Sequence, residues 1–123
     1  PGATNTAGWN KAFAGSNGIN LIDDYAWYNA NAGASTHLAG TRLPNELILH
    51  DLSGNVAEWL WDWYGMLPTG TITDYRGPGP SSGRVYRGGS FMNGAAALGL
   101  SYRSQYSPHM RNSSLCFRVV RAL

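Results

Sequence analysis

The chain has 123 residues and a mass of 13.3 kDa, which is the size of one small domain or of a part of a larger one. Its hydrophobic content of 43% and aromatic content of 12% exclude an intrinsically disordered chain. Residues 1–74 hold seven acidic and two basic side chains, whereas residues 75–123 hold seven arginines and no acidic residue. A basic half could neutralise phosphates, but isolated arginines between small and aromatic residues favour carbonyl bonds and internal ion pairs. We therefore expect no nucleic-acid partner.

The single cysteine, Cys116, excludes an intrachain disulfide and any metal site built from several cysteines. It alternates with apolar Leu115 and Phe117, a setting typical of an unreactive buried thiol. The three histidines are isolated, and no pair has the spacing of a zinc site. No apolar run approaches the ~20 residues that a membrane-spanning helix needs, so we expect no direct membrane insertion.

The first third of the chain predicts irregular structure. Glycines interrupt residues 1–22, where only Ile19, Leu21 and Ile22 offer an apolar anchor. Small and polar residues at 29–41 are typical of a surface loop.

Residues 47–64 have the pattern of packed strands. Trp59, Trp61 and Trp63 recur with period two, so they share one face of a strand. The simplest interpretation is a tryptophan face buried in the core, and the alternative is an exposed binding platform. Glycine and proline at 65–83 then predict a long loop.

Two further strands are predicted in the second half. Residues 84–91 alternate until Gly88 and Gly89 interrupt them as a bulge would, and residues 115–119 alternate as a last strand. The segment 92–114 between them fits no amphipathic template. Tyrosine, methionine and serine on a loop held between strands are typical of a binding surface.

Five motifs, in this order and spacing, resemble the signatures of the formylglycine-generating enzyme (sulfatase-modifying factor) family. They are Pro-Asn-Glu-Leu at 44–47, Asp-Leu-Ser-Gly-Asn-Val-Ala-Glu-Trp at 51–59, Trp-Asp-Trp-Tyr-Gly at 61–65, Arg-Gly-Gly-Ser-Phe at 87–91 and Phe-Arg-Val-Val at 117–120. The resemblance implies an α+β protein with a C-type lectin-like fold of the formylglycine-generating enzyme type, made of short twisted antiparallel sheets and long loops. The family's earlier Arg-Leu-Pro-Thr-Glu motif is absent. We therefore expect residues 1–123 to be the C-terminal part of a single such domain, with the N-terminal part of the same domain as a partner.

Family members that oxidise a substrate cysteine carry cysteines of their own shortly after Arg-Gly-Gly-Ser, where thiolates bind the metal. Residues 92–98 of this chain contain no cysteine, and Cys116 stands where the family usually has glycine. The resemblance therefore favours a non-enzymatic protein without a redox cofactor. The alternatives are a formylglycine-generating-type oxidase, a degenerate enzyme of that family, and a carbohydrate-binding lectin.

The segment after Arg-Gly-Gly-Ser resembles that of the variable proteins of diversity-generating retroelements, a branch of the same family. The resemblance implies a receptor-like or adhesin-like protein, outside the cell or on its surface, that binds an unknown protein or cell-surface ligand through a diversified segment at about 91–114. The fixed framework of that branch corresponds to Ala95, Arg103, Pro108, Arg111, Phe117 and Arg118. The ligand-binding variable positions are Met92, Asn93, Gly94, Ala96, Ala97, Tyr102, Ser104, Gln105, Tyr106, Ser107, His109, Met110 and Asn112.

The resemblance also implies a structural calcium site. The family's pattern of an acid or amide, a glycine and a later glutamate matches Asp51, Gly54, Val56 and Glu58. Two carboxylates and two backbone carbonyls are the oxygen ligands that Ca²⁺ prefers. The alternative is that Asp51 and Glu58 pair with arginines of the basic half.

Overall fold

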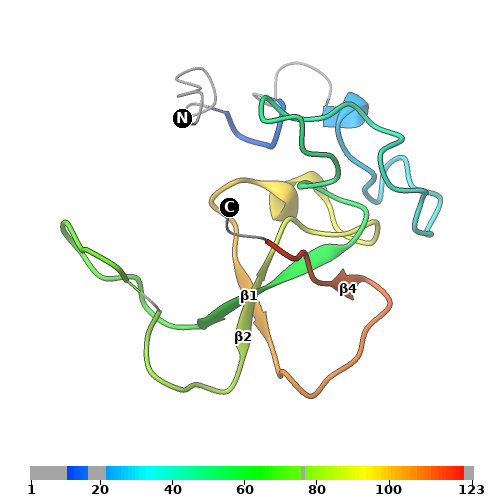
Figure 1. The fold of residues 1–123 in the computed structure, drawn as a ribbon. Coiled ribbons are helices and arrows are strands. Elements are labelled where there is room, and N and C mark those ends of the chain that lie inside the picture. Colours follow the sequence, from blue (N-terminus) through cyan, green and yellow to red (C-terminus); the bar gives the residue numbers. More distant parts are fainter. Residues whose placement is uncertain (1–10, 17–21, 76, 121–123) are drawn as a thin grey trace.

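Regular secondary structure is sparse in the computed structural model, which describes residues 11–16, 22–75 and 77–120. Two short 3-10 helices, η1 (Ile22–Asp24) and η2 (Ala95–Leu98), are the helices of these residues. Figure 1 shows a curled sheet at one end of the molecule, the loops of the first half at the other end, and η2 between them. None of the described residues forms a helix of the length and apolar character needed to cross a bilayer.

The sheet has four strands in the order β3-β2-β1-β4. They are β1 (Ala57–Trp63), β2 (Arg84–Arg87), β3 (Ser104–Tyr106) and β4 (Leu115–Cys116). The β1–β2 and β2–β3 pairs are antiparallel, as expected, but β4 pairs with β1 in parallel. The sheet is therefore mixed, and the helical share of an α+β protein is limited to two single turns.

The buried apolar core of the described residues is small. It consists of Ala14, Ala26, Ala32, Ala57, Val85, Phe91 and Leu98. Hydrogen bonds from buried polar side chains join the segments around it. The Asn55 amide bonds both the N–H and the carbonyl of His37, and the Asn55 main chain bonds the Trp27 carbonyl and the Phe91 N–H. These bonds let irregular segments pack together, because they give the polar groups of Asn55 partners inside the protein.

Two glycines allow close approaches of the backbone near this core. Gly54 has φ +81°, and a Cβ there would lie 2.3 Å from the Trp27 carbonyl oxygen. Gly89 has φ +64°, and a Cβ there would lie 2.7 Å from Leu98 Cδ1. A side chain at either position would therefore meet both backbone strain and a neighbouring group. The break in the strand pattern at Gly88 and Gly89 is confirmed, because β2 ends at Arg87.

The prediction of a buried tryptophan face is wrong for Trp61. Its side chain is 83% exposed, whereas Trp59 and Trp63 are half-buried. The cause lies in the β1–β2 register, which shifts between Trp59 and Trp63 so that Trp61 falls in an irregular stretch. A bulge re-aims the residue that it inserts. Trp61 still contacts Arg84 together with Trp63, but its ring is open to solvent rather than buried in the core.

Two other strand predictions were too long. Residues 47–56 form no strand, and β1 begins only at Ala57. The last strand ends at Cys116, and Phe117 and Val119 are 74% and 82% exposed among the described residues. The loops predicted at 29–41 and 65–83 are confirmed as far as the structure describes them. Ile19 and Leu21, the expected apolar anchor, lie outside the described residues.

Candidate ligand-binding site

The predicted variable segment leaves the core at Phe91 and returns to the sheet at β4. Leu98, which is buried in η2, fixes its first part, and the Leu100 N–H donates to the Ala12 carbonyl at 2.8 Å. The segment then forms the edge strand β3 and a loop (Figure 1). The exposed members of the predicted set are Met92, Gly94, Ala96, Tyr102, Gln105, His109, Met110 and Asn112, and the half-buried members are Asn93, Ala97, Ser104, Tyr106 and Ser107.

Cross-strand register places two of these positions beside aromatic residues of the sheet. Ser104 pairs with Tyr86, which pairs in turn with Trp59. The Trp59 and Tyr86 rings meet edge to face, with centroids 6.3 Å apart. Directly paired residues project from the same face of a sheet, so Ser104 extends an aromatic row.

The second row of the same face runs through Tyr106, Arg84 and Trp63. The Arg84 guanidinium carbon lies 3.9 Å from the Trp63 ring centroid and 4.8 Å from that of Trp61. Sequence reasoning missed this cluster because the period-two pattern placed Trp61 in the core. The alternative interpretation of the three tryptophans, an exposed binding platform, would have led to this cluster.

Two asparagines of the predicted set use their side chains locally. Asn93 Oδ1 accepts hydrogen bonds from the Ser90 N–H and hydroxyl at 2.9 and 2.8 Å. Asn112 Oδ1 accepts from the Ser114 N–H and hydroxyl at 2.9 and 2.7 Å. These side chains stabilise turns at the two ends of the segment, as Asn commonly does, so they have less freedom to contact a ligand than their neighbours.

Arginines hold the segment through main-chain carbonyl groups. Arg87 Nε donates to the Tyr102 carbonyl at 3.1 Å, and Arg87 Nη2 donates to the Leu100 carbonyl. Arg103 Nη2 donates to the Gly65 carbonyl, and its guanidinium lies 4.8 Å from the Tyr64 ring centroid. The sequence expectation of carbonyl-bound arginines is confirmed here. Of the other framework positions, Pro108, Arg111 and Phe117 are exposed.

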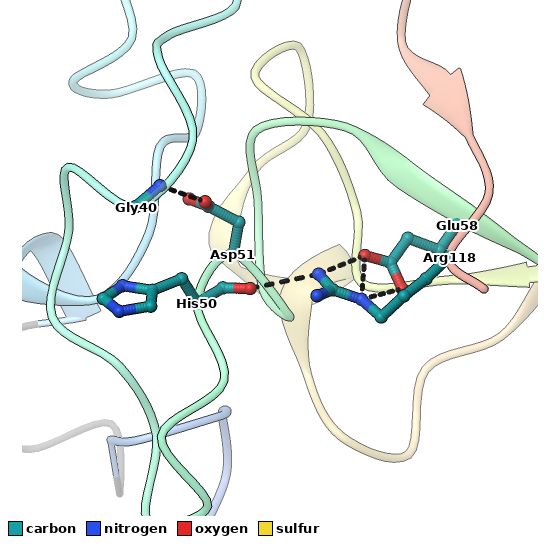
Figure 2. Close-up of polar contacts among 5 residues, drawn as sticks. All are labelled: Gly40, His50, Asp51, Glu58 and Arg118. Carbon is teal, nitrogen blue, oxygen red and sulfur yellow. Dashed lines mark hydrogen bonds and ion pairs between the residues drawn. The ribbon is translucent and has the colours of Figure 1, made fainter. Parts of the chain in front are cut away.

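Asp51 and Glu58, the two acidic residues of the predicted calcium site, lie near Arg118 of the C-terminal segment (Figure 2). Arg118 Nε donates to Glu58 Oε1 and Oε2 at 2.9 and 3.1 Å, and Nη2 donates to Oε1 at 2.6 Å. This hydrogen-bonded carboxylate raises the pKa of Arg118. Glu58 is thus paired with an arginine, which was the alternative to a calcium site.

Asp51 has a different environment from Glu58. Its Oδ2 accepts from the Gly40 N–H at 2.8 Å, whereas its Oδ1 is buried without a hydrogen-bond partner. No three His, Cys, Asp or Glu side chains of the described residues gather as a metal-binding group. The two carboxylates therefore do not present a ready pair of free oxygens, and the calcium site stays a prediction.

Cys116 lines a groove of about 670 Å³ next to this ion pair, together with apolar Ile48, Phe117 and Val119. Burial, and secondarily the negative charge of Glu58, raise the pKa of the Cys116 thiol. A raised pKa lowers the fraction of reactive thiolate at neutral pH. This environment agrees with the unreactive thiol expected from the sequence.

The sheet, the sparse helices and the loop-borne segment define a domain of the formylglycine-generating enzyme type. The chain belongs to the family described as Sulfatase-modifying factor enzyme 1-like domain, which matches residues 2–123.

Within this family the chain is similar to a variable protein. Treponema denticola variable protein 1 superposes with a TM-score of 0.84 and 41% identity, over 89% of this chain and 40% of that one. The crystal structure of CarF superposes with a TM-score of 0.66 and 26% identity, over 92% of this chain and 38% of that one. Chaperone protein LppX of Paenibacillus barcinonensis is 28% identical over 122 residues, which are 85% of this chain and 40% of that protein. The chain thus spans about two fifths of the length of these relatives, and its resemblance to the variable branch of the family is confirmed.

Proposed function

We propose that this chain is a non-enzymatic ligand-binding protein that displays a retroelement-diversified surface on the scaffold of its family. The observation that carries the proposal is its similarity to Treponema denticola variable protein 1, at 41% identity over 89% of the chain. The receptor-like or adhesin-like role and the location outside the cell or on its surface are parts of the same proposal. The ligand is a protein or another cell-surface molecule.

The placement of the variable segment supports binding rather than core packing. Tyr102, His109 and Met110 are exposed, and Tyr106 lies on a sheet face next to other aromatic residues. Tyrosine offers a large contact area at a low cost in side-chain entropy. The folded core does not depend on these side chains, because its described members are Val85, Phe91, Leu98 and four alanines.

Sequencing this gene from many sibling isolates tests diversification directly. We expect replacements to gather between Met92 and Ser114, while Arg103, Pro108 and Arg111 stay unchanged. A reverse transcriptase gene beside a near-copy of the codons for residues 85–120, differing at adenines, is the expected genomic context. Replacements spread evenly over the chain would contradict the proposal.

A structural calcium ion at Asp51 and Glu58 is a second, separate proposal. The unpartnered Asp51 Oδ1 supports it, but the ion would have to replace Arg118 as the partner of Glu58. Calcium is expected to raise the melting temperature, because an ion that binds only the folded state stabilises it. Asp51→Asn and Glu58→Ala should each abolish the shift. If the melting temperature is the same in calcium and in chelator, there is no calcium site, and Glu58 serves as the partner of Arg118 and Asp51 as the acceptor of the Gly40 N–H.

We also propose that the remaining part of a longer family domain is a partner of this chain. The proposal is supported by the coverage of about two fifths of each relative and by the exposure of large apolar side chains such as Ile48, Phe117 and Val119. Contact with a further polypeptide would remove these side chains from water, which is favourable. If the proposal holds, co-expression with the rest of the reading frame raises the melting temperature of this part.

A further inference from the structure

Arg84 occupies an unusual position on the aromatic face of the sheet. Its guanidinium is held over the rings of Trp61 and Trp63 at 4.8 and 3.9 Å, and Nη1 donates to the Trp61 carbonyl. Stacking against aromatic rings and one hydrogen bond fix the plane of the group before any ligand arrives. A fixed guanidinium loses little conformational entropy when it binds a further partner.

The charge of Arg84 has no acidic partner among the described residues. Their salt bridges are Lys11–Glu46 and Arg118–Glu58. Arg84 Nε and Nη2 make no hydrogen bond within the same part of the chain, and residues 75–123 contain no acidic side chain. Donors with no protein partner on a planar, oriented guanidinium match the geometry of a carboxylate.

This cluster borders the diversified segment. Tyr106 is the cross-strand partner of Arg84, on the side away from Trp63. Arg84, Trp61 and Trp63 are outside the variable set, whereas Tyr106 is inside it. A ligand that contacts Tyr106 from this face therefore meets a fixed cation as well.

We propose that Arg84, flanked by Trp61 and Trp63, is a constant anchor that binds a carboxylate of an acidic polypeptide ligand. The inference rests on the proposed ligand-binding function and adds the chemical class of the ligand. Tyr106 and the other variable positions then select among acidic segments, while the anchor supplies a contact that all of them share.

The distribution of arginines favours a polypeptide over a nucleic acid. Arg87 and Arg103 donate hydrogen bonds to main-chain carbonyl groups, and the charge of Arg118 is neutralised by Glu58. Among the described residues of the basic half, Arg84 and the exposed Arg111 are the arginines that remain, and two cations are fewer than the row of phosphate contacts that holds a nucleic-acid backbone. A single oriented guanidinium between aromatic rings suits one carboxylate next to apolar groups.

The test is to pan a random peptide library over the immobilised full chain and to measure the affinity of the recovered peptides for variants. The peptides should be enriched in Asp and Glu relative to the unselected library. Arg84→Gln should weaken their binding by about ten-fold or more, and Arg84→Lys should restore only part of it, because an ammonium lacks the planar fork. Arg111→Gln removes the same charge elsewhere and serves as the control, with binding expected to stay within about two-fold. Both Arg84 variants should remain folded, with melting temperatures lowered by only a few degrees through the weakened cation–π contacts, whereas Arg111→Gln should leave the melting temperature unchanged.

Each other outcome has a definite meaning. Peptides that depend on Tyr102 and Tyr106 but bind Arg84→Gln normally would overturn the anchor and leave the variable surface in place. If replacing Tyr102 and Tyr106 and replacing Arg84 all leave peptide binding unchanged, or if no peptide is recovered, the Arg84 anchor and the proposed ligand-binding surface are both overturned. Tight binding of a random-sequence oligonucleotide that Arg84→Gln abolishes would overturn the acidic polypeptide as the ligand class.

Discussion

Trp61 in strand β1 and Leu98 in helix η2 show how position in the fold, rather than residue type, decides burial in this protein. Trp61 is 83% exposed because the register shift in β1 turns it outward, and its ring covers the guanidinium of Arg84. Leu98 is 1% exposed and packs against the backbone at Gly89. Trp61, although it is the larger side chain, is therefore expected to contribute less to the stability of the fold than Leu98.

Truncation of the two residues should reveal this difference. Leu98→Ala is expected to lower the free energy of unfolding by about 2–5 kcal/mol, through lost burial and the cavity left behind. Trp61→Ala is expected to cost only about 0.5–1 kcal/mol, the range of an exposed cation–π contact. Urea denaturation followed by circular dichroism measures both values. A larger loss for Trp61→Ala would mean that Trp61 is buried after all.

At the level of elements, the edge strand β3 and the irregular segments on both sides of it carry the exposed residues of the predicted variable set without supplying the core. Tyr102 and His109 are exposed, and Tyr106 is half-buried at the sheet edge. Hot-spot residues in interfaces are enriched in aromatic side chains, so a few of these positions should dominate binding.

Simultaneous replacement of Tyr102, Tyr106 and His109 by alanine should abolish ligand binding while the domain remains folded. Binding is measured with the peptides recovered from the library, and folding by the near-ultraviolet spectrum and melting temperature. Tyr75→Ala, at a tyrosine that is also exposed but lies in the 65–83 loop, is the control and should leave binding unchanged. An insoluble triple variant would place these side chains in the core instead.

The strands and loops differ in how far they could be predicted from the sequence. β1 and β2 were recognisable because alternating large side chains cover much of each strand, and glycine and proline marked the 65–83 loop. β3 was not recognisable, since Ser104, Gln105 and Tyr106 form a short edge strand without an apolar face. The exposure of Trp61 depends on the register of a partner strand, which no local pattern contains. The variable segment is predicted from its motifs and stays a prediction, whereas the Arg84 cluster could be recognised only from the coordinates.

For the whole molecule, Arg118 joins three distant segments. Its guanidinium bonds Glu58 in β1 and the carbonyl of His50 in the preceding loop, while its own backbone follows β4 (Figure 2). The contacts span 60 and 68 residues of sequence. The ion pair therefore connects β1 to the segment after the last strand, and the bond to the His50 carbonyl adds the irregular first half.

Removal of this connection should destabilise the whole domain moderately. Arg118→Ala is expected to cost about 1–2 kcal/mol, because Glu58 then remains partly buried without a partner. A double-mutant cycle with Glu58→Ala should give a coupling of about 1 kcal/mol or less, since the Arg118 side chain is 39% exposed and solvent screens the pair. Urea denaturation provides the four free energies. Additive losses would show that the two side chains act independently.

The bonds from Arg87 and Arg103 to carbonyl groups bear on how many sequences this scaffold can accept. Arg87 binds the carbonyl of Tyr102, a position expected to change between siblings, and does not depend on the tyrosine ring for that bond. Every amino acid supplies the same carbonyl, including proline. A repertoire of different side chains can therefore share one set of supports, and a new variant does not have to evolve a new way of holding its loop.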